Sequence, residues 1–391
     1  MALTFTIAGI VAGGCVVYLL TIVAVVRFRS ESPTPKTTPS QGRAISVLKA
    51  VHGDEPELEQ NLRSFFEINY PAYELLFAAR QDDDPALSLA RELCRQYPNV
   101  PTKILVTGEP PCPNAKVFSL QKMAAAAQHD LLVISDSDIR ADQNYLANIA
   151  VEFADPRVGV VTCPYRAVPG ASFWSLLEAL GMNSEFWGGV VLARMLAPMD
   201  FAVGPTMAIS RGCLNAVGGF ESVNDYLAED FVLGQKARAV GFDVRLAKSV
   251  VEHRIGADSF ASNFRHRIRW NRSTRRSRPW GYVGQVFTNP LPWALLAVPF
   301  SAFAEWSIWL LAVCALLRFA ALIAVGPVLL RDRLTARYFW LVPLQDVASL
   351  LVWFVAFFGN KITWRGRQFH LTADGRLEPT VATEPPTESR H

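Results

Sequence analysis

Residues 2–26 form an apolar run without a charged side chain. Such a run must be buried either in a membrane or in an unusually apolar protein core. At about 1.5 Å of rise per residue, a helix of this length crosses a hydrocarbon core of ~30 Å. The first positive charges, Arg27 and Arg29, follow the run, whereas a secretory signal peptide has them before a shorter apolar core. We predict a transmembrane anchor over residues 1–28, with a buried core helix as the alternative.

The remaining composition suits a catalytic domain joined to membrane segments. The chain has 391 residues, of which 51% are hydrophobic and 19% charged, more apolar than an ordinary soluble enzyme. A net charge of +3 provides no basic footprint for a nucleic acid. None of the six cysteines has the C-x-x-C spacing of a zinc or redox site, so we expect reduced thiols in a domain that faces the cytoplasm.

Residues 29–43 are rich in Ser, Thr and Pro and are predicted to be a linker. From residue 44 to 285, short β-rich runs alternate with helical stretches. The predicted strands are 45–51, 74–79, 102–106, 131–135 and 158–163, and the predicted helices are 55–67, 85–97, 116–128 and 142–153. This alternation predicts an α/β domain with a mainly parallel sheet covered on both faces. Ligands of such sheets bind beyond the carboxyl ends of the strands.

Residues 286–360 form a second apolar region, and residues 361–391 form a polar tail with a basic start. Within this region, 290–330 is long enough for two short spans or for one span and an interfacial helix, and 338–358 is a further candidate. The positive-inside rule places the basic residues after the anchor, and the catalytic domain, in the cytoplasm. Three later spans would place the basic tail outside, so either one block is not a full span or the tail breaks the rule. We expect a cytoplasmic tail.

Acidic residues follow two of the predicted strands. Asp82, Asp83 and Asp84 come after the strand at 74–79, and Asp136 and Asp138 come after the strand at 131–135. In a D-x-D at a strand end, alternate side chains point the same way, so two carboxylates can face one site. Such oxygen ligands suit Mg²⁺ or Mn²⁺ bridging a diphosphate. A solvated acidic turn is the alternative.

Two further motifs stand in the second half of the domain. Glu229 and Asp230 open a predicted helix, where carboxylates also complement the helix dipole. The segment His266-Arg267-Ile268-Arg269-Trp270 begins a basic stretch, which either contacts anionic headgroups or reaches a leaving diphosphate.

Taken in this order, the motifs resemble the set of inverting family 2-type glycosyltransferases and, more closely, the ceramide glucosyltransferase family (family 21-type). Bacterial hopanoid-biosynthesis glycosyltransferases are a close sister. The matching segments are 81–86 (QDDDPA), 114–117 (NAKV), 135–140 (SDSDIR), 204–207 (GPTM), 228–231 (AEDF) and 268–270 (IRW). Three departures stand out: His266 replaces Gln or Arg, D-S-D replaces the D-S-G of the animal enzymes, and the first acidic turn is one residue shorter. The matching aspartate among Asp82, Asp83 and Asp84 is therefore open.

The resemblance implies a GT-A, Rossmann-like catalytic domain (nucleotide-diphospho-sugar transferase) over residues 44–285, with transmembrane helices, in the bacterial inner membrane. It implies a hexose transfer, most simply of glucose, from a UDP-sugar to the hydroxyl of a ceramide-type lipid. The acceptor in the main alternative is a hopanoid, with N-acetylglucosamine as the sugar. A polysaccharide synthase and a non-enzymatic membrane scaffold are further alternatives. The oligomeric state stays open.

By the same resemblance, Asp230 is the general base, and Asp136 and Asp138 hold a divalent metal, Mn²⁺ or Mg²⁺. The implied donor-binding residues are Asp82, Asp83, Asp84, Lys116, Asp136, Arg267, Arg269 and Trp270.

Several residues leave two interpretations open. His253 is either a further metal ligand or a structural histidine. The segment 172–196 is either a core helix or an interfacial helix that receives the lipid. Glu305 and Asp346, inside apolar blocks, are either functional or paired with a nearby Arg or Lys.

Overall fold

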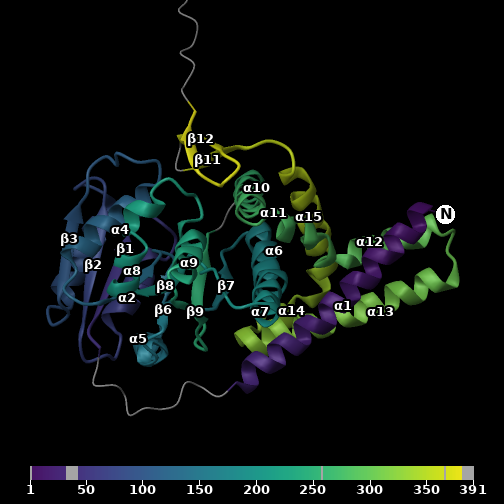
Figure 1. The fold of residues 1–391 in the computed structure, drawn as a ribbon, viewed down its shortest axis with the longest axis horizontal. Helices are drawn as coiled ribbons and strands as arrows, with labels where there is room; N and C mark the ends of the chain where they lie inside the picture. The colour runs from purple at the N-terminus through teal and green to yellow at the C-terminus, as the bar shows by residue number, and fades with distance from the viewer. Residues whose placement is uncertain (1, 32–42, 257–258, 365–366, 381–391) are drawn as a thin grey trace, which may run out of the picture.

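The computed structural model describes residues 2–31, 43–256, 259–364 and 367–380 (Figure 1). Most of the predicted linker at 29–43 and the last part of the predicted tail lie outside these ranges. Figure 1 shows an α/β domain at one end of the molecule and a bundle of long helices at the other, with shorter helices between them.

A seven-stranded sheet in the order β3-β2-β1-β4-β8-β6-β9 forms the centre of the α/β domain. Its strands are β1 (Ile45–Ala50), β2 (Tyr73–Ala79), β3 (Thr102–Val106), β4 (Leu131–Ser135), β6 (Val158–Thr162), β8 (Thr206–Ser210) and β9 (Asp243–Leu246). The first four pair in parallel, β6 pairs in parallel with β9, and only β8 runs antiparallel to its neighbours. The predicted α/β class with a mainly parallel sheet is confirmed.

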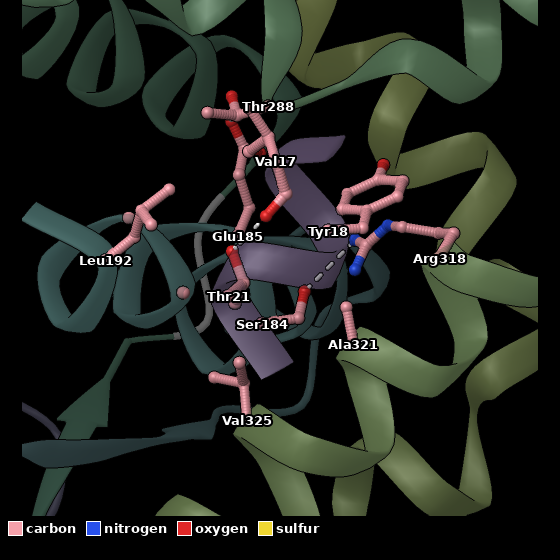
Figure 2. Close-up of a pocket in the computed structure, with 12 residues that line it drawn as sticks. Val17, Tyr18, Thr21, Ser184, Glu185, Leu192, Thr288, Arg318, Ala321 and Val325 are labelled. Carbon is pink, nitrogen blue, oxygen red and sulfur yellow. Dashed lines mark hydrogen bonds between the residues drawn. The ribbon is translucent and has the colours of Figure 1, made fainter. Parts of the chain in front are cut away.

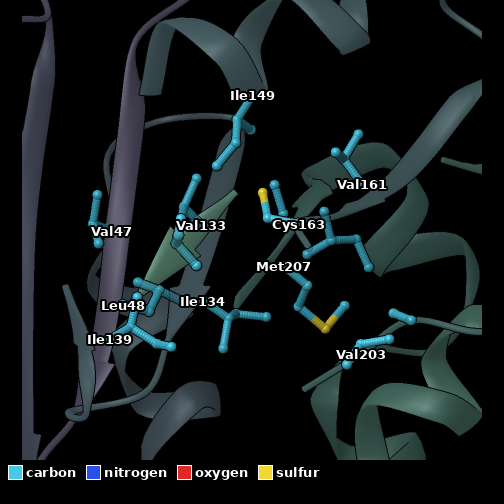
Figure 3. Packing of buried hydrophobic residues seen from close by; sticks show 14 of the residues in the cluster. Val47, Leu48, Val133, Ile134, Ile139, Ile149, Val161, Cys163, Val203 and Met207 are labelled. Atoms are coloured by element: carbon cyan, nitrogen blue, oxygen red, sulfur yellow. The ribbon is translucent and has the colours of Figure 1, made fainter. Parts of the chain in front are cut away.

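Helices connect these strands and pack on the sheet. They are α2 (Leu58–Phe66), α3 (Pro85–Gln96), α4 (Ala115–Ala126), α5 (Tyr145–Ala150) with η1 (Val151–Ala154), α8 (Arg211–Ala216), η3 (Phe220–Val223) and α9 (Glu229–Ala239). Helices α3 and α4 contact strands β1 to β3, whereas α8 and α9 contact the strands on the other side of β4. Figure 3 shows the core from close by, where Val47 of β1, Val133 of β4 and Met207 of β8 are all buried. This packing follows from strands whose residues are apolar on both faces.

A small second sheet, in the order β5-β10-β7, stands beside the carboxyl end of β4. Its strands are β5 (Ile139–Arg140), β7 (Tyr165–Pro169) and β10 (Val251–Ile255). Strand β5 begins directly after the D-x-D, and β10 places His253 opposite Ile139. The second sheet therefore forms one wall next to the D-x-D turn.

Three helices in the described part of the chain are long and apolar enough to cross a membrane: Ala2–Ser30, Glu305–Leu330 and Phe339–Ala356. The first is α1. The second consists of α13 (Glu305–Ile323) and η5 (Ala324–Leu330), and the third of η6 (Phe339–Leu341) and α15 (Val342–Ala356). A short helix α14 (Leu334–Arg337) links the last two. These helices agree with the predicted anchor and the later apolar blocks.

The apolar helix α12 (Pro290–Phe300) is much shorter and runs beside the first half of α1. It begins next to Gly14, where a Cβ atom would lie 2.3 Å from the Pro290 ring, and it ends near Thr4, whose hydroxyl donates to Phe300 O at 3.5 Å. Helix α13 then returns along α1, and Arg29 donates to Val328 O at 2.7 Å. At ~1.5 Å per residue, α12 alone is too short to cross a bilayer.

Shorter helices fill the space between the α/β domain and the bundle. They are α6 (Phe173–Gly181), the π-helical turn η2 (Met182–Phe186), α7 (Trp187–Leu196), α10 (Phe260–Ser277), α11 (Pro279–Gly284) and η4 (Gln285–Phe287). In the segment 172–196, Trp187 belongs to the large hydrophobic core that includes the α/β domain, while Gly188 faces Thr21 of α1. The segment is thus packed in the core and also touches the apolar helix α1, which agrees with a core helix, while an interfacial helix that receives the lipid stays a prediction.

The chain then forms a third sheet from β11 (Lys361–Trp364), β12 (Arg367–Leu371) and β13 (Leu377–Pro379), all antiparallel. It has a small apolar core of Ile362, Phe369, Leu371 and Leu377. Part of the predicted polar tail is thus an ordered sheet, which packs on the α/β domain through Leu227.

Candidate active site

A cluster of opposite charges lies beyond the carboxyl end of β4. The Nζ atom of Lys116, in the first turn of α4, lies 2.7 Å from Asp136 Oδ1 and 3.0 Å from Glu229 Oε1. Burial acts against the charge of Lys116, but the two carboxylates more than offset it and raise the pKa of the lysine. The structure thus brings together three of the predicted motifs: the one at 114–117, the D-x-D and the Glu229–Asp230 pair.

Glu229 contacts Lys116 in this cluster. The sequence did not indicate that Glu229 takes part in the site. Its side chain is buried, and its Oε2 also accepts from Asn114 Nδ2 at 3.4 Å. The sequence offered a helix-start carboxylate as the simple explanation, and Glu229 does stand in the first turn of α9. Its two partners show that it also joins α9 to α4.

Lys49 is a second buried cation that the sequence did not reveal, because it lies inside the apolar strand β1. Its Nζ donates to Asp136 O at 2.8 Å and to Ser135 Oγ at 3.3 Å, and it stands 3.6 Å from the centre of the Phe65 ring. Burial lowers the pKa of Lys49 to about 7, against the attraction of Asp136 and Asp138. A lysine in a strand otherwise composed of apolar and small residues is the signal that could have found it.

Asp230 follows Glu229 and faces the loop before β8. A Cβ atom on Gly204 would lie 2.8 Å from Asp230 Oδ2, so a side chain there would collide with the carboxylate. Although Asp230 keeps some contact with solvent, the surrounding protein and then the charge of Glu229 raise its pKa to about 7, against the attraction of Lys116. A carboxyl group with this pKa accepts a proton readily near neutral pH.

Asp138 contacts the second sheet through His253. The distance from His253 Nε2 to Asp138 Oδ2 is 3.0 Å, and the imidazole also stands edge-on to Tyr165 with ring centres 5.0 Å apart. Burial acts to raise the pKa of Asp138, but the charge and hydrogen bond of His253 lower it below the ordinary value. His253 is therefore bound to one of the two predicted metal ligands.

The D-x-D fits a hard divalent cation in its donor chemistry. Asp138 Oδ1 is buried and accepts no hydrogen bond from the residues that the structure describes, so a carboxylate oxygen is left for another partner. No group of three or more His, Cys, Asp or Glu side chains with metal-binding geometry occurs among those residues. Asp136 and Asp138 would thus hold the metal together with ligands from the donor.

The first acidic cluster divides into one buried and two exposed aspartates. Asp84 is buried and its Oδ1 accepts from Gly53 N and from Ala86 N, both at 2.9 Å, so it caps α3 and holds the loop after β1. Asp82 pairs with Arg91 at the surface, and Asp83 is exposed. Of the three candidates, Asp84 is the one directed at the sheet end.

Helix α10 carries the predicted basic motif along the junction with the membrane helices. Arg267 donates to Ser349 Oγ of α15 at 2.9 Å, away from the charge cluster, and burial lowers its pKa. Trp270 packs against the catalytic core and lies 4.5 Å from the His266 ring, centre to centre. Arg269 is half-buried on the same helix.

The arginines that follow this motif bind the end of α15. Arg275 donates to Phe357 O at 2.7 Å and to Gly359 O at 3.0 Å, and Arg272 donates to Phe358 O at 2.7 Å. These carbonyls lie at the carboxyl end of α15, where cations are favourable. The sequence had offered headgroups or a diphosphate as their partners.

Polar side chains also gather inside the helix bundle (Figure 2). A cavity of about 20 Å³ between α1, η2, α7 and α13 is lined by Tyr18, Ser184, Glu185 and Arg318 among others. Arg318 pairs with Asp346 at 2.7 Å and donates to Ser184 Oγ at 3.2 Å. Of the two interpretations of Asp346, pairing with an arginine is the one observed.

Comparisons with known proteins identify relatives of this chain. Residues 5–377 match the model of the family described as glycosyl transferase family 21. Ceramide glucosyltransferase 1 of Caenorhabditis elegans is 26% identical over 261 residues, which are 65% of this chain and 55% of that protein. Ceramide glucosyltransferase 3 of the same organism is 24% identical over 227 residues, 58% of this chain and 49% of that protein. The chain thus spans about half the length of these curated relatives.

A solved structure supports the fold. The mannosyltransferase PcManGT from Pyrobaculum calidifontis, solved with GDP-Man and Mn²⁺, superimposes with a TM-score of 0.53 at 18% identity, covering 89% of this chain and 98% of that one. At this identity the likeness shows the fold alone, and it confirms the predicted GT-A architecture. The match over nearly the whole chain confirms the predicted enzyme class, a glycosyltransferase. This chain belongs to glycosyl transferase family 21.

Proposed function

We propose that the chain transfers glucose from a UDP-sugar to the primary hydroxyl of a ceramide-type lipid, with inversion at the anomeric carbon. The observation that carries the proposal is the juxtaposition of Asp230 with the ion cluster of Lys116, Asp136 and Glu229 at the sheet end. A proton acceptor and a site for the diphosphate thus lie next to each other. The names of the matched relatives favour ceramide over a hopanoid.

In this reaction the lipid hydroxyl oxygen attacks the anomeric carbon of the donor. The bond from that carbon to the diphosphate oxygen breaks, and its electron pair leaves with UDP. Asp230 takes the proton of the hydroxyl, which its pKa of about 7 allows near neutral pH. A single displacement from the face opposite the leaving group converts an α-linked sugar into a β-glycoside.

The charge cluster serves the leaving group. Lys116 stands between Asp136 and Glu229 and supplies a fixed positive charge near the place where the diphosphate leaves. A divalent cation held by Asp136 and Asp138 would neutralise further charge there when bound, in agreement with the Mn²⁺ named for the structural neighbour. Lys49 holds the D-x-D turn through Asp136 O, so it keeps both carboxylates in place.

The other residues predicted to bind the donor differ in how well their positions suit a donor site at the sheet end. Asp84 is the one of the three aspartates held at the sheet end, but its Oδ1 already accepts from two backbone amides and its Oδ2 lies 3.1 Å from His52 Nδ1, so we assign it to holding the loop beside the uracil or ribose. Arg269 and Trp270 lie on α10 between the site and the membrane helices and remain candidates for the diphosphate and for packing. Arg267 is the weakest candidate because Ser349 already accepts from it.

We also propose that the bundle enters the membrane with the catalytic domain on the cytoplasmic side, beside the inner membrane of a bacterium. Helix α1 crosses once, and α12 with α13 forms a hairpin that enters and leaves on the same side. Helix α15, which packs against α6 and α10, does not cross. This arrangement keeps the sheet β11–β13 on the side of the catalytic domain, as its bond from Leu377 N to Asp225 O requires. It also satisfies the positive-inside rule for Arg27, Arg29 and the basic start of the tail.

Mass spectrometry tests the proposal on two levels. Cells that express the chain and contain ceramide should accumulate a hexosylceramide, and cells with Asp230→Asn should not. Purified protein in lipid nanodiscs should release UDP from UDP-glucose only when ceramide is present. Transfer to a hopanoid polyol but not to ceramide would change the acceptor, whereas no sugar transfer from any UDP-sugar would refute the proposed reaction.

A further inference from the structure

The C-terminal sheet is bonded to the loop that leads into α9. Leu377 N donates to Asp225 O at 2.7 Å, and Tyr226 forms an antiparallel bridge with Arg376. Leu227 packs against the apolar core of the same sheet. Residues 225–227 therefore lie along the edge of the sheet like a further strand, two residues before Glu229.

Side chains from two other parts of the chain hold this loop. The guanidinium of Arg376 stands 5.0 Å from the centre of the Tyr226 ring and 3.8 Å from Asp225 Oδ2. Asn114, the first residue before α4, also donates from Nδ2 to Tyr226 O at 2.8 Å. The loop is thus fixed between the helix that carries Lys116 and the C-terminal sheet.

Apart from the contacts of Glu229 with Lys116 and Asn114, the start of α9 has no side-chain cap. The residue before the helix is Ala228, which has no side chain to bond the free amides of the first turn. A serine or aspartate at that place would fix the turn locally. Without such a cap, the position of Glu229 and Asp230 depends on the contacts of Glu229 with α4 and on how firmly residues 225–227 are held.

The other end of the sheet is attached to α10. Arg272 donates to Phe358 O and to Lys361 O, so it binds both the end of α15 and the first residue of β11. Arg275 binds Phe357 O and Gly359 O in the same turn. The sheet therefore connects the helix of the Arg-Trp motif with the loop of the Glu-Asp motif, which lie about forty residues apart.

We propose that the sheet β11–β13 is a positioning element of the active site. Arg376 and Leu377 act as positioning residues, which fix the start of α9 and thereby the direction of the Asp230 carboxylate toward the acceptor. The inference rests on the proposed function, since it takes Asp230 to be the base. A misplacement of about 1 Å can reduce a rate by ~10²-fold, so a loosened loop should lower kcat without affecting donor binding.

A reversible cross-link tests this role. Bridge partners on adjacent strands have the Cα spacing that a disulfide spans, so Tyr226→Cys/Arg376→Cys replaces the natural contacts with a removable bond. We expect the reduced enzyme to lose about 10-fold to 100-fold in kcat, with the affinity for UDP-glucose within about 2-fold of wild type. Oxidation should restore most of the loss. The acid limb of the pH–rate profile should lie at lower pH in the reduced form, because a loosened loop exposes Asp230 to water.

The matched control is His370→Cys/Glu378→Cys, which cross-links β12 to β13 inside the sheet without reaching the loop. Its rate, and that of the wild type with its native cysteines, should not respond to the redox state. Equal rates of Tyr226→Cys/Arg376→Cys in both states, or low rates in both, would overturn the positioning role. Asp230→Asn distinguishes a failure of the proposed base from a failure of the positioning role. If that variant is slow while the cross-link has no effect on the rate, only the positioning role fails. If Asp230→Asn keeps the wild-type rate, the proposed base fails and the positioning role fails with it.

Discussion

The Nζ atom of Lys116 lies 3.0 Å from Oε1 of Glu229, and this ion pair brings Glu229 into the charge cluster beside Asp230. Because the negative charge of Glu229 is one of the causes that raise the pKa of Asp230, its removal should lower that pKa. We expect Glu229→Gln to shift the acid limb of the pH–rate profile to lower pH. The measurement is kcat/KM from pH 5 to 9 with saturating metal. An unchanged or higher midpoint would show that Glu229 does not act on the base.

Replacement of the base should affect chemistry more than binding. Asp230→Asn keeps the shape of the side chain but takes no proton, so we expect turnover to fall by about 10²–10⁴-fold with UDP-sugar affinity within a few-fold. The experiment is donor affinity by calorimetry beside the transfer rate to a lipid acceptor. If Asp230→Asn transfers sugar normally while Glu229→Gln is dead, the base is Glu229.

The same substitution should change stability in a pH-dependent way. The folded-state pKa of Asp230 is raised to about 7, above the value of an unfolded carboxyl group, so the charged form destabilises the fold. This loss of stability is small in acid and is complete once the pH has risen through 7. Asp230→Asn should therefore raise the Tm more at pH 8 than at pH 5. An equal change at both pH values would contradict a raised pKa.

Removal of divalent metal should abolish transfer. Asp138 retains a buried oxygen without a hydrogen bond among the described residues, and Asp138→Asn should weaken the binding of Mn²⁺ and of UDP together. Calorimetry with UDP, with and without Mn²⁺, measures this coupling independently of activity. Full activity in excess chelator, and UDP binding indifferent to Mn²⁺, would exclude a metal at the D-x-D.

The ion pair inside the bundle gives a stability prediction. Arg318 and Asp346 are both buried and joined by two hydrogen bonds of 2.7 and 2.8 Å. Arg318→Ala leaves the carboxylate unpaired, which typically costs about 3–5 kcal/mol. Arg318→Met/Asp346→Leu removes both charges and should recover most of the lost Tm in detergent. If the double variant is as unstable as Arg318→Ala, the loss of stability does not come from an unpaired carboxylate alone.

The parts of the fold that could be predicted are those with local sequence patterns. Strands β1 to β4 are short apolar runs bounded by polar residues, and their observed limits differ from the expected ones by one residue at most. Asp136 and Lys116, predicted from motifs, do meet in one cluster. A sheet of parallel strands brings its carboxyl ends together, so motifs at those ends converge without knowledge of the detailed packing.

The parts that could not be predicted depend on contacts between distant residues. Lys49 lies in an apolar strand, and only its distance to the backbone of Asp136 reveals its role. The strands β11 to β13 carry exposed polar residues on one side, and their core is completed by Leu227, which is far away in the sequence. Arg267 was expected at the donor, yet Ser349 on α15 is its partner, because nothing in the sequence gives the direction of one helix relative to another.

The hydrogen bond from Leu377 N to Asp225 O means that the active site can be completed only late in synthesis, after β13 has been made. A ribosome makes residues 225–230 long before it makes β13, and α15 lies between them in the chain. The loop in front of Asp230 therefore lacks its last support until α15 has been made and the strands after it have emerged. A nascent chain that stalls during insertion carries all of the predicted catalytic side chains, but its site is not yet assembled.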